Sequence, residues 1–374
     1  MELGKTSSPE SSLINRVKTN AYAAVIAAGA RLQGAYKPMP REVEYAKPPK
    51  TDNPLYNDSH YFNFFDHDHR IGGFTRIGKL ANQNASLGMF YIFDGEDAAL
   101  VLLQSEHIPR DLQELRSSCI RYEIIEPLKE LRIVTTAKFL RLEDPNELSD
   151  PIACARRFED NDFVTVDVDI TFRACAEVHN SKRFYARGLA DRMVEKGFGL
   201  KDLMEARKFA AEHYEQVGSY SGSIRIGSRR IELKNASGHR DHSWGPRDMS
   251  AIKGWTWLTA QFGNETAVNL AWFNAGKLDI HSGFICRKGH NYPCRVHRLE
   301  TEFEDNGITQ KSIRFTVEDT SGFTMDVQGK VLNPIPIIAA DDENNYTIVF
   351  EAMTEYEWQG KTAYGISEYV HKIR

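Results

Sequence analysis

The sequence is poor in cysteine. Its 374 residues include five cysteines, at Cys119, Cys154, Cys175, Cys286 and Cys294. They are odd in number, widely spaced and form no Cys-x-x-Cys pair, so neither a disulfide framework nor a zinc cage is expected. The pattern is typical of reduced thiols in an intracellular protein.

Long apolar runs and an excess of positive charge are also missing. The Ala-rich run 21–30 is shorter than the ~20 residues of a membrane span and lacks the charged lead of a signal peptide. Lys plus Arg number 47 and Asp plus Glu 52, for a net charge of -5, which argues against nucleic acid as a partner. We therefore expect a soluble cytoplasmic protein with no membrane span.

Motifs for common cofactors are missing as well. No Gly-x-Gly-x-x-Gly joins a strand to a helix, no complete Walker motif Gly-x-x-x-x-Gly-Lys-Ser/Thr occurs, and no Gly-x-Ser-x-Gly elbow is found. Nucleotide-dependent and serine-hydrolase chemistry are disfavoured, and the expected cofactor is none.

What the sequence does contain is β-strand texture in two stretches, 56–183 and 217–374. Short β-branched and aromatic runs recur, and residues 164–171 alternate apolar and polar side chains, the period of a sheet with one wet face. The runs are separated by ~8–12 residues with no βαβ rhythm. We predict a mainly β protein of two lipocalin-like antiparallel barrels of about eight strands each, the type that encloses one small apolar ligand.

Helices are predicted in two places. Residues 11–34 have apolar residues at helical spacing and form, with the Pro-rich segment 37–54, an N-terminal arm over 1–55. Residues 184–216 form a mid-chain helical insert. The Ala/Val/Ile stripe of the first helix would suit a partner subunit, so a homo-oligomer is possible.

The densest polar segment is GHRDHSWGPRD, residues 238–248. Protonating a carbon–carbon double bond needs an acid that stays neutral at pH 7, such as a carboxyl group against an apolar wall, and aromatic faces to stabilise the cation. Asp241 is the candidate acid, with His242 or His239 to orient it or accept a proton. The candidate substrate-binding residues are Arg240, Arg247, Trp244, Trp257 and Trp272. A buried ion-pair network with core tryptophans is the structural alternative.

Three other positions carry weaker signals. Glu215, at the end of the helical insert, is the second candidate acid, or else a solvated helix end. Tyr61 lines either the first barrel's ligand space or its core. His67 and His69 would share one strand face as half of a metal site, but a polar hairpin turn is the simpler interpretation.

Four strings carry a family resemblance: GHRDHSWGPRD, GWTWLTAQF after it, GISEY near the C-terminus, and YFNFFDHDHRIGGFTRIG over 61–78. They resemble a bacterial family of tandem lipocalin-like proteins that is distantly similar to carotenoid 1,2-hydratases (hydroxyneurosporene synthases). The resemblance spans about 56–372. It implies a dry cavity for an isoprenoid, polyene or polyketide-like substrate, with hydration, cyclisation or shape-controlled ring closure, and it matches Asp241 and His242 to the family's motif.

Together these features predict a cofactor-independent lyase or isomerase of hydratase, dehydratase or cyclase type. Its substrate would be a hydrophobic small molecule such as a terpenoid, a steroid-like compound or an aromatic compound. A non-catalytic carrier of a lipophilic ligand is the alternative. A mononuclear metal enzyme using His67 and His69 is a weaker one.

Overall fold

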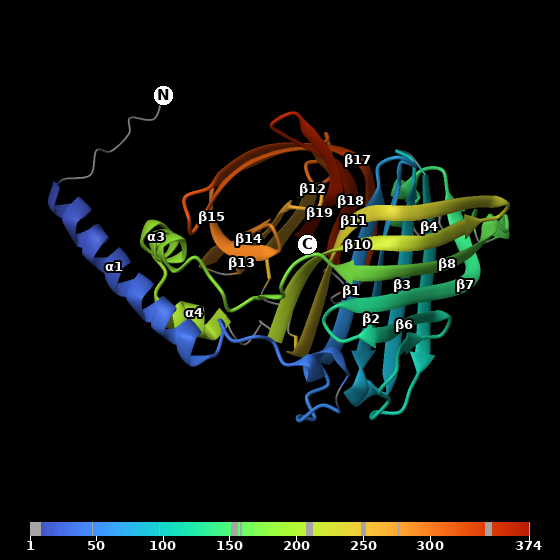
Figure 1. Ribbon diagram of the computed structural model, residues 1–374, viewed down its shortest axis with the longest axis horizontal. Helices are drawn as coiled ribbons and strands as arrows, with labels where there is room; N and C mark the ends of the chain where they lie inside the picture. The colour runs from blue at the N-terminus through green and yellow to red at the C-terminus, as the bar shows by residue number, and fades with distance from the viewer. Residues whose placement is uncertain are drawn as a thin grey trace.

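Two units built of strands lie side by side, with helices beside the second (Figure 1). The computed structural model describes residues 9–46, 48–96, 98–150, 156–157, 159–206, 212–247, 252–275, 277–340 and 346–373. The predicted fold class, mainly β with two barrel-like units, an N-terminal helix and a helical insert, is confirmed.

The first unit is one antiparallel sheet with the strand order β4-β3-β2-β1-β11-β10-β8-β7-β6-β5. Three residue pairs join β4 to β7, from Ala99↔Leu142 to Val101↔Leu140, so the sheet curls back on itself. Its strands are β1 Tyr56–Asp66, β2 Ile71–Leu80, β3 Ala85–Asp94, β4 Ala98–His107, β5 Leu115–Ser117, β6 Ile120–Glu126, β7 Glu130–Leu142, β8 Phe163–Ala174, β9 His179–Asn180, β10 Glu212–Ile226 and β11 Arg229–Pro246.

The second unit is a closed barrel of eight consecutive strands. They are β12 Gly254–Phe262, β13 Thr266–Ala275, β14 Leu278–Arg287, β15 His290–Phe303, β16 Gln310–Asp319, β17 Thr324–Ala340, β18 Tyr346–Trp358 and β19 Lys361–Ile373.

The division between the two units differs from the sequence interpretation, which assigned 217–246 to the second half. The hairpin β10–β11 pairs with β8 on one side and β1 on the other, so it belongs to the first sheet. β10 also starts inside the predicted insert 184–216. Alternating side chains identify a strand but not its neighbours, which is why the pairing could not be anticipated.

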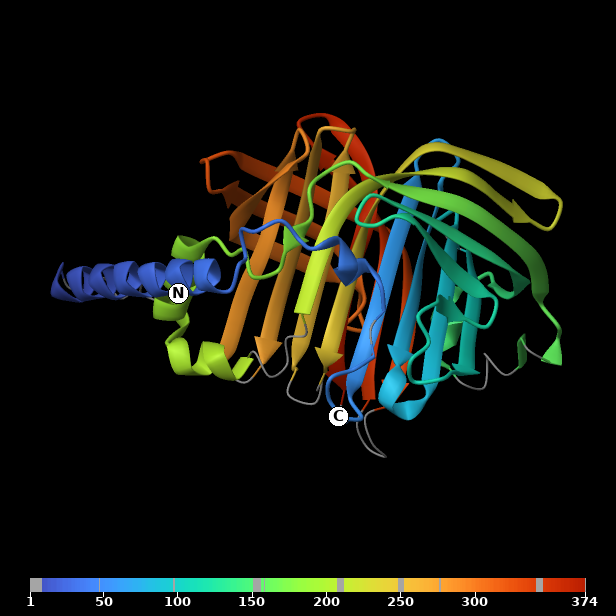
Figure 2. The ribbon, with the colours of Figure 1, turned by 60° about the horizontal axis from the view of Figure 1, so that its bottom comes forward.

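The helices gather on the outside of the barrel, at the left of Figure 2. They are α1 Pro9–Leu32, α3 Ala186–Lys196 and α4 Leu200–Ala206, with single turns of 3-10 helix at η1 Arg41–Glu44, η2 Ala81–Gln83 and η3 Pro145–Ser149. Ile26 of α1 packs with Leu189 and Met193 of α3 and with Ile280 of β14.

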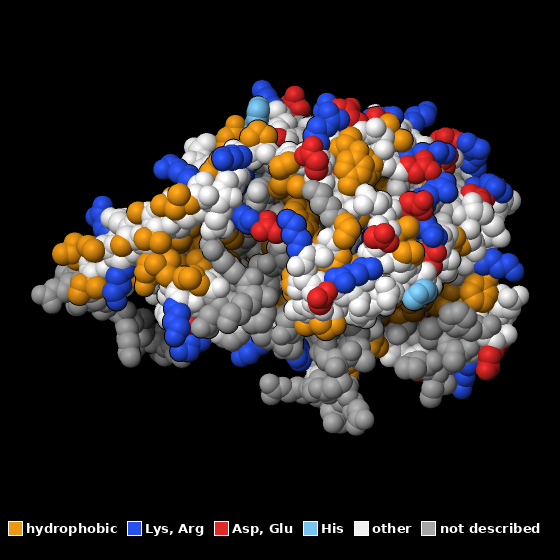
Figure 3. All heavy atoms as spheres, turned by 90° about the horizontal axis from the view of Figure 1, so that it is seen from below, with side chains coloured by type: hydrophobic (Ala, Val, Ile, Leu, Met, Phe, Trp, Pro, Cys, Tyr) orange, Lys and Arg blue, Asp and Glu red, His pale blue; other side chains and the backbone are white. Residues whose placement is uncertain are grey.

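The outward face of α1 is apolar, as Figure 3 shows in orange along the projecting helix. Its exposed large hydrophobic side chains are Leu13, Ile14, Val17, Val25 and Leu32. Among the helices that the structure describes, none combines the length and apolarity needed to cross a bilayer.

The alternation along β1 produces two separate cores. Phe62 and Phe64 point into the first unit, whereas Tyr61 and Phe65 point outward and pack against the barrel. The shared core between the units adds Trp257, Met353 and Ile366 from the barrel. Each such aromatic or aliphatic side chain contributes about 1.5–3 kcal/mol when fully buried. The interface between the units is therefore a third hydrophobic core.

Candidate functional site

Polar side chains occupy one stretch of this interface. On the first sheet, register brings Glu215 of β10, Asp241 of β11, Tyr61 of β1 and Arg76 of β2 into one row, each opposite the next. Residues opposite each other on neighbouring strands share a face and have Cβ atoms about 4.5–5.5 Å apart. Four strands thus present a row of chemically active groups toward the barrel.

A second row on the barrel faces the first. Register sets Trp257 of β12 opposite Glu368 of β19, and Glu368 opposite Glu351 of β18. The Tyr61 hydroxyl donates to Glu351 Oε2 at 3.2 Å, and the Tyr61 ring meets the edge of Trp257 with centroids 5.3 Å apart. These contacts join the two rows.

We call this set the inter-barrel cluster. Besides the two rows it includes Asn269, His213 and Arg247. Asn269 donates to Glu215 Oε2 at 2.7 Å, and Arg247 acts electrostatically on Glu368. His213 Nε2 lies 3.3 Å from Glu215 Oε1 and 3.8 Å from Asp241 Oδ2. The side chains of His213 and Asp241 are 22% and 23% exposed, whereas Glu215 is 8% exposed. Water can therefore reach the cluster at His213 and Asp241, whereas Glu215 is shielded from solvent.

The pKa values of three of its carboxyl groups are raised. Burial, then the charge of the Glu368 carboxyl hydrogen-bonded to it, raises the pKa of Glu351 well above its usual range. Burial and the charge of Asp241 do the same to the pKa of Glu215. Burial raises the pKa of Glu368 to about 7. A carboxylic acid that is half protonated near neutral pH is suited to general acid chemistry.

The raised pKa of Glu368 predicts a pH-dependent stability. Its pKa is about 7 in the folded protein against 4.5 ordinarily, so the folded state binds the extra proton and stability falls as pH rises from about 4.5 to about 7. Urea unfolding should find Glu368→Gln more stable than the parent at pH 8, by about 3 kcal/mol, with little difference at pH 4. Equal stabilities at pH 8 would contradict the assignment, and exposed Glu357→Gln is the control.

Several residues singled out from the sequence meet in this cluster. Asp241, Glu215, Tyr61 and Trp257 belong to its rows. His239 lies two residues before Asp241 on β11 and faces the same side of the sheet. Its side chain is fully buried, and burial lowers its pKa to about 3. No hydrogen bond reaches its Nε2 from the part of the chain that the structure describes.

Other predicted residues point the opposite way. Neighbours along a strand face opposite sides, so Arg240, His242 and Trp244 point into the first unit while Asp241 points out. His242 Nε2 is 2.8 Å from Asp58 Oδ1, and its ring stacks on His60 with centroids 3.6 Å apart. The prediction that His242 orients Asp241 is therefore wrong.

The predicted tryptophans divide in the same way. Trp244 packs beside His242, with ring centroids 4.8 Å apart. Trp272 donates from Nε1 to Asp279 at 2.9 Å, beside Arg192 of α3, which also bonds Asp279. Of the three tryptophans proposed to face a cation, only Trp257 belongs to the inter-barrel cluster.

A second buried network fills the first unit around Arg240. The Arg240 guanidinium donates to both oxygens of Glu44, at 2.7 and 2.9 Å, and also to Gln216 Oε1. Both charged side chains are fully buried. Glu44 belongs to η1 in the N-terminal arm, so this network, rather than substrate, is the partner of Arg240.

Ligand atoms of Glu44, His60 and His242 lie within 4.8 Å of one another, a spacing that could hold a metal ion. The donors do not fit one. Both Glu44 oxygens are engaged by Arg240, and they also accept hydrogen bonds from the Tyr214 hydroxyl and the Leu128 backbone. A cation there would displace these bonds and sit against a guanidinium.

His67 and His69, the other suggested metal ligands, lie in the turn between β1 and β2. His69 Nδ1 is 3.0 Å from Asp66 Oδ1, and the ring of His67 packs on Tyr364 with centroids 4.8 Å apart. This corresponds to the hairpin-turn interpretation.

Comparison with known proteins identifies relatives of the fold. No curated protein sequence matches the chain. A crystal structure of an AttH-like protein from Nitrosomonas europaea aligns with a TM-score of 0.53 and 10% identity, covering 85% of this chain and 93% of that one. Kievitone hydratase from Nectria haematococca aligns with a TM-score of 0.54 and 12% identity, covering 90% of this chain and 94% of that one. At such identities the likeness concerns the fold alone.

The family is shown by sequence. Residues 40–373, which include η1 and both strand-built units, match the family described as "Domain of unknown function (DUF7064)". The chain belongs to the DUF7064 family.

Proposed function

We propose that this protein is a cofactor-independent lyase or isomerase, of hydratase, dehydratase or cyclase type, acting on a hydrophobic small molecule at the inter-barrel cluster. The observation that carries the proposal is the hydrogen-bonded carboxyl pair Glu351–Glu368, set opposite Asp241 in an aromatic interface, with the pKa of Glu368 raised to about 7. The fold is also shared with a hydratase.

In the hydration direction, Glu368 would donate a proton to one carbon of a substrate double bond, leaving a cation on the other carbon. Glu351, the buried partner, would hold the shared proton in place, while burial and the charge of Asp241 would keep Glu368 protonated near neutral pH. Water then adds to the cation through its oxygen and releases one proton. Dehydration follows the same steps in reverse, and a cyclase would replace water by a second double bond.

The released proton needs an acceptor on the exposed side of the cluster. Asp241 and His213, whose facing atoms are 3.8 Å apart, are suited to take it and to return it to Glu368 through solvent. The sequence suggested Asp241 as the acid; the geometry favours Glu368 in that role and Asp241 as the base. The rings of Tyr61 and Trp257 would stabilise the cation by roughly 0.5–2 kcal/mol each.

Substitution of Asp241 tests this proposal. The purified protein is incubated with terpenoid, steroid-like and aromatic alkenes in ¹⁸O-labelled water, and products and co-purified ligands are identified by mass spectrometry. We expect label incorporation by the parent protein, and a loss of at least 100-fold in Asp241→Asn with ligand affinity unchanged. Asp326→Asn, at an exposed ion pair of the barrel, is the matched control. Ligand binding with no turnover by the parent would favour a lipophilic carrier.

A further inference from the structure

A row of small side chains lies next to the row of Asp241, Tyr61 and Arg76 on the first sheet. Ser243 of β11, Ser59 of β1 and Gly78 of β2 are opposite one another in register, two residues along each strand from Asp241, Tyr61 and Arg76. Ser59 and Ser243 are 2% and 1% exposed. On β10 the residue in register with Ser243 is His213, which bounds this small-residue row on one side.

Two guanidinium groups reach over it from either end. Arg247 donates from Nη2 to the Ser243 hydroxyl at 2.7 Å. Arg76 lies directly over Gly78, where a Cβ would meet its Nη1 at 2.9 Å and its Nη2 at 3.0 Å. The missing side chain of Gly78 is what makes room for the Arg76 guanidinium. Ser59 lies between the two arginines.

Neither arginine has a carboxylate oxygen within 4.0 Å among the described residues. Their positive charges instead oppose each other, since burial, then the charge of Arg247, lowers the pKa of Arg76 to about 10. The charges of Asp241 and Glu368 act on Arg76 in the opposite direction and raise its pKa, but by less than burial and Arg247 lower it.

We propose that Arg76 and Arg247, above the small-residue floor at Ser59, bind an anionic oxygen group of the substrate, a carboxylate, phenolate or enolate. The inference rests on the proposed function and names its substrate class: an apolar molecule with one acidic end. The planar fork of arginine donors matches such groups. The apolar part of the substrate extends from there toward Tyr61 and Trp257, which brings its reacting carbons next to Glu368.

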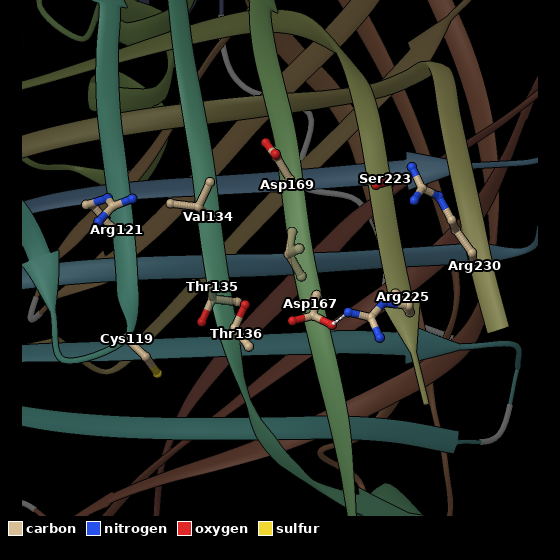
Figure 4. Close-up of a pocket in the computed structure, with 11 residues that line it drawn as sticks. Cys119, Arg121, Val134, Thr135, Thr136, Asp167, Asp169, Ser223, Arg225 and Arg230 are labelled. Atoms are coloured by element: carbon tan, nitrogen blue, oxygen red, sulfur yellow. Dashed lines mark ion pairs between the residues drawn. The ribbon is translucent and has the colours of Figure 1, made fainter. Parts of the chain in front are cut away.

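Another arginine-rich hollow on the outer side of the first sheet provides a contrast (Figure 4). Its three arginines are already paired: Arg225 with Asp167, Arg121 with Glu123 and Arg230 with Glu232. A ligand anion would have to displace those carboxylates. Arg121 therefore serves as the control for general effects of removing an arginine.

The test is a comparison of two probes of the same shape, 2-naphthoate and neutral 2-naphthamide, by isothermal titration calorimetry at pH 7. We expect naphthoate to bind the parent protein at least tenfold more tightly. Arg76→Met and Arg247→Met should each lower naphthoate affinity at least tenfold and change naphthamide affinity less than twofold. Arg121→Met should leave both unchanged. Gly78→Ala keeps every charge but displaces the Arg76 guanidinium, and should weaken naphthoate several-fold.

Equal affinities for the two probes in the parent protein would overturn the proposal, and so would an Arg121→Met effect as large as that of Arg76→Met. Circular dichroism and thermal melting check folding; should Arg76→Met not fold, Gly78→Ala and Arg247→Met decide. The result is separable from the proposed reaction, since binding is measured without turnover. A preference for naphthoate with no turnover of any substrate would support the anion site and contradict the proposed enzymatic function.

Discussion

Replacement of Glu368 by Gln is expected to lower turnover by 10²- to 10⁴-fold, the usual contribution of a general acid. The glutamine side chain keeps the size and one hydrogen-bonding oxygen of the carboxyl group but has no proton to give. Glu351, fixed against the Tyr61 hydroxyl, is less accessible than Glu368 and would not replace it fully. Steady-state kinetics with a substrate found by the labelled-water screen measures the loss.

The pH profile separates this role from a structural one. Because the acid acts only when protonated and the pKa of Glu368 is about 7, kcat/KM of the parent should be highest below pH 7. Above that pH it should fall by a factor of about ten per unit. In Glu368→Gln the residual kcat/KM should no longer fall above pH 7. A parent rate that rises through pH 7 would contradict an acid at this position, and Glu357→Gln should keep the parent profile.

The strands and the existence of two units could be predicted because the alternation of apolar and polar residues in a strand is visible in the sequence itself. The side of the sheet to which each residue points was harder to predict. The string GHRDHSWGPRD reads as one polar cluster, yet in a strand its Asp241 and His242 point to opposite sides. Only a residue-by-residue assignment of faces, starting from buried Phe62 and Phe64, would have separated them.

Other members of the site were missed because they come from distant strands. Glu368 is the acidic residue of the GISEY string, and Arg76 lies in FTRIG, so both were within motifs that carried the resemblance. Their meeting depends on the packing of the barrel against the first sheet, which local periodicity does not contain. Glu351 had no sequence signal beyond being a charge flanked by the apolar residues 348–350 and 352–353, a pattern that marks a buried polar group needing a partner.

The N-terminal arm gives the clearest case of a hidden contact. The prolines of its segment 37–54 exclude a long helix there, and nothing in the sequence REVE, residues 41–44, distinguishes Glu44 from a surface residue. In the fold, Glu44 is fully buried inside the first unit and bonded to Arg240, the Tyr214 hydroxyl and the Leu128 backbone. Although burial opposes ionisation, the Arg240 guanidinium holds the pKa of Glu44 at about 2. The match to the family begins at residue 40, so this contact lies within the family domain.

Replacement of Glu44 by Gln should therefore destabilise the protein by about 3–5 kcal/mol, because it leaves the Arg240 charge buried without its counter-ion. Urea unfolding at pH 7 measures the loss. Breaking the exposed pair Arg314–Asp326 with Asp326→Asn should cost less than about 1 kcal/mol, which makes it the matched control.

The double variant Glu44→Gln/Arg240→Met distinguishes the buried charge from lost packing. With no charge left to bury, it should recover much of the stability that the single variant loses, because apolar replacement of a whole buried pair is often close to neutral. The parent itself should lose the contribution of this pair as pH falls from about 4.5 to about 2, through the lowered pKa of Glu44. A single variant as stable as the parent would mean that the arm is not fastened by this pair. The anion-binding side chains would not share in the loss, since Arg240 and Asp241 face opposite sides of β11 and the inter-barrel cluster makes none of these bonds.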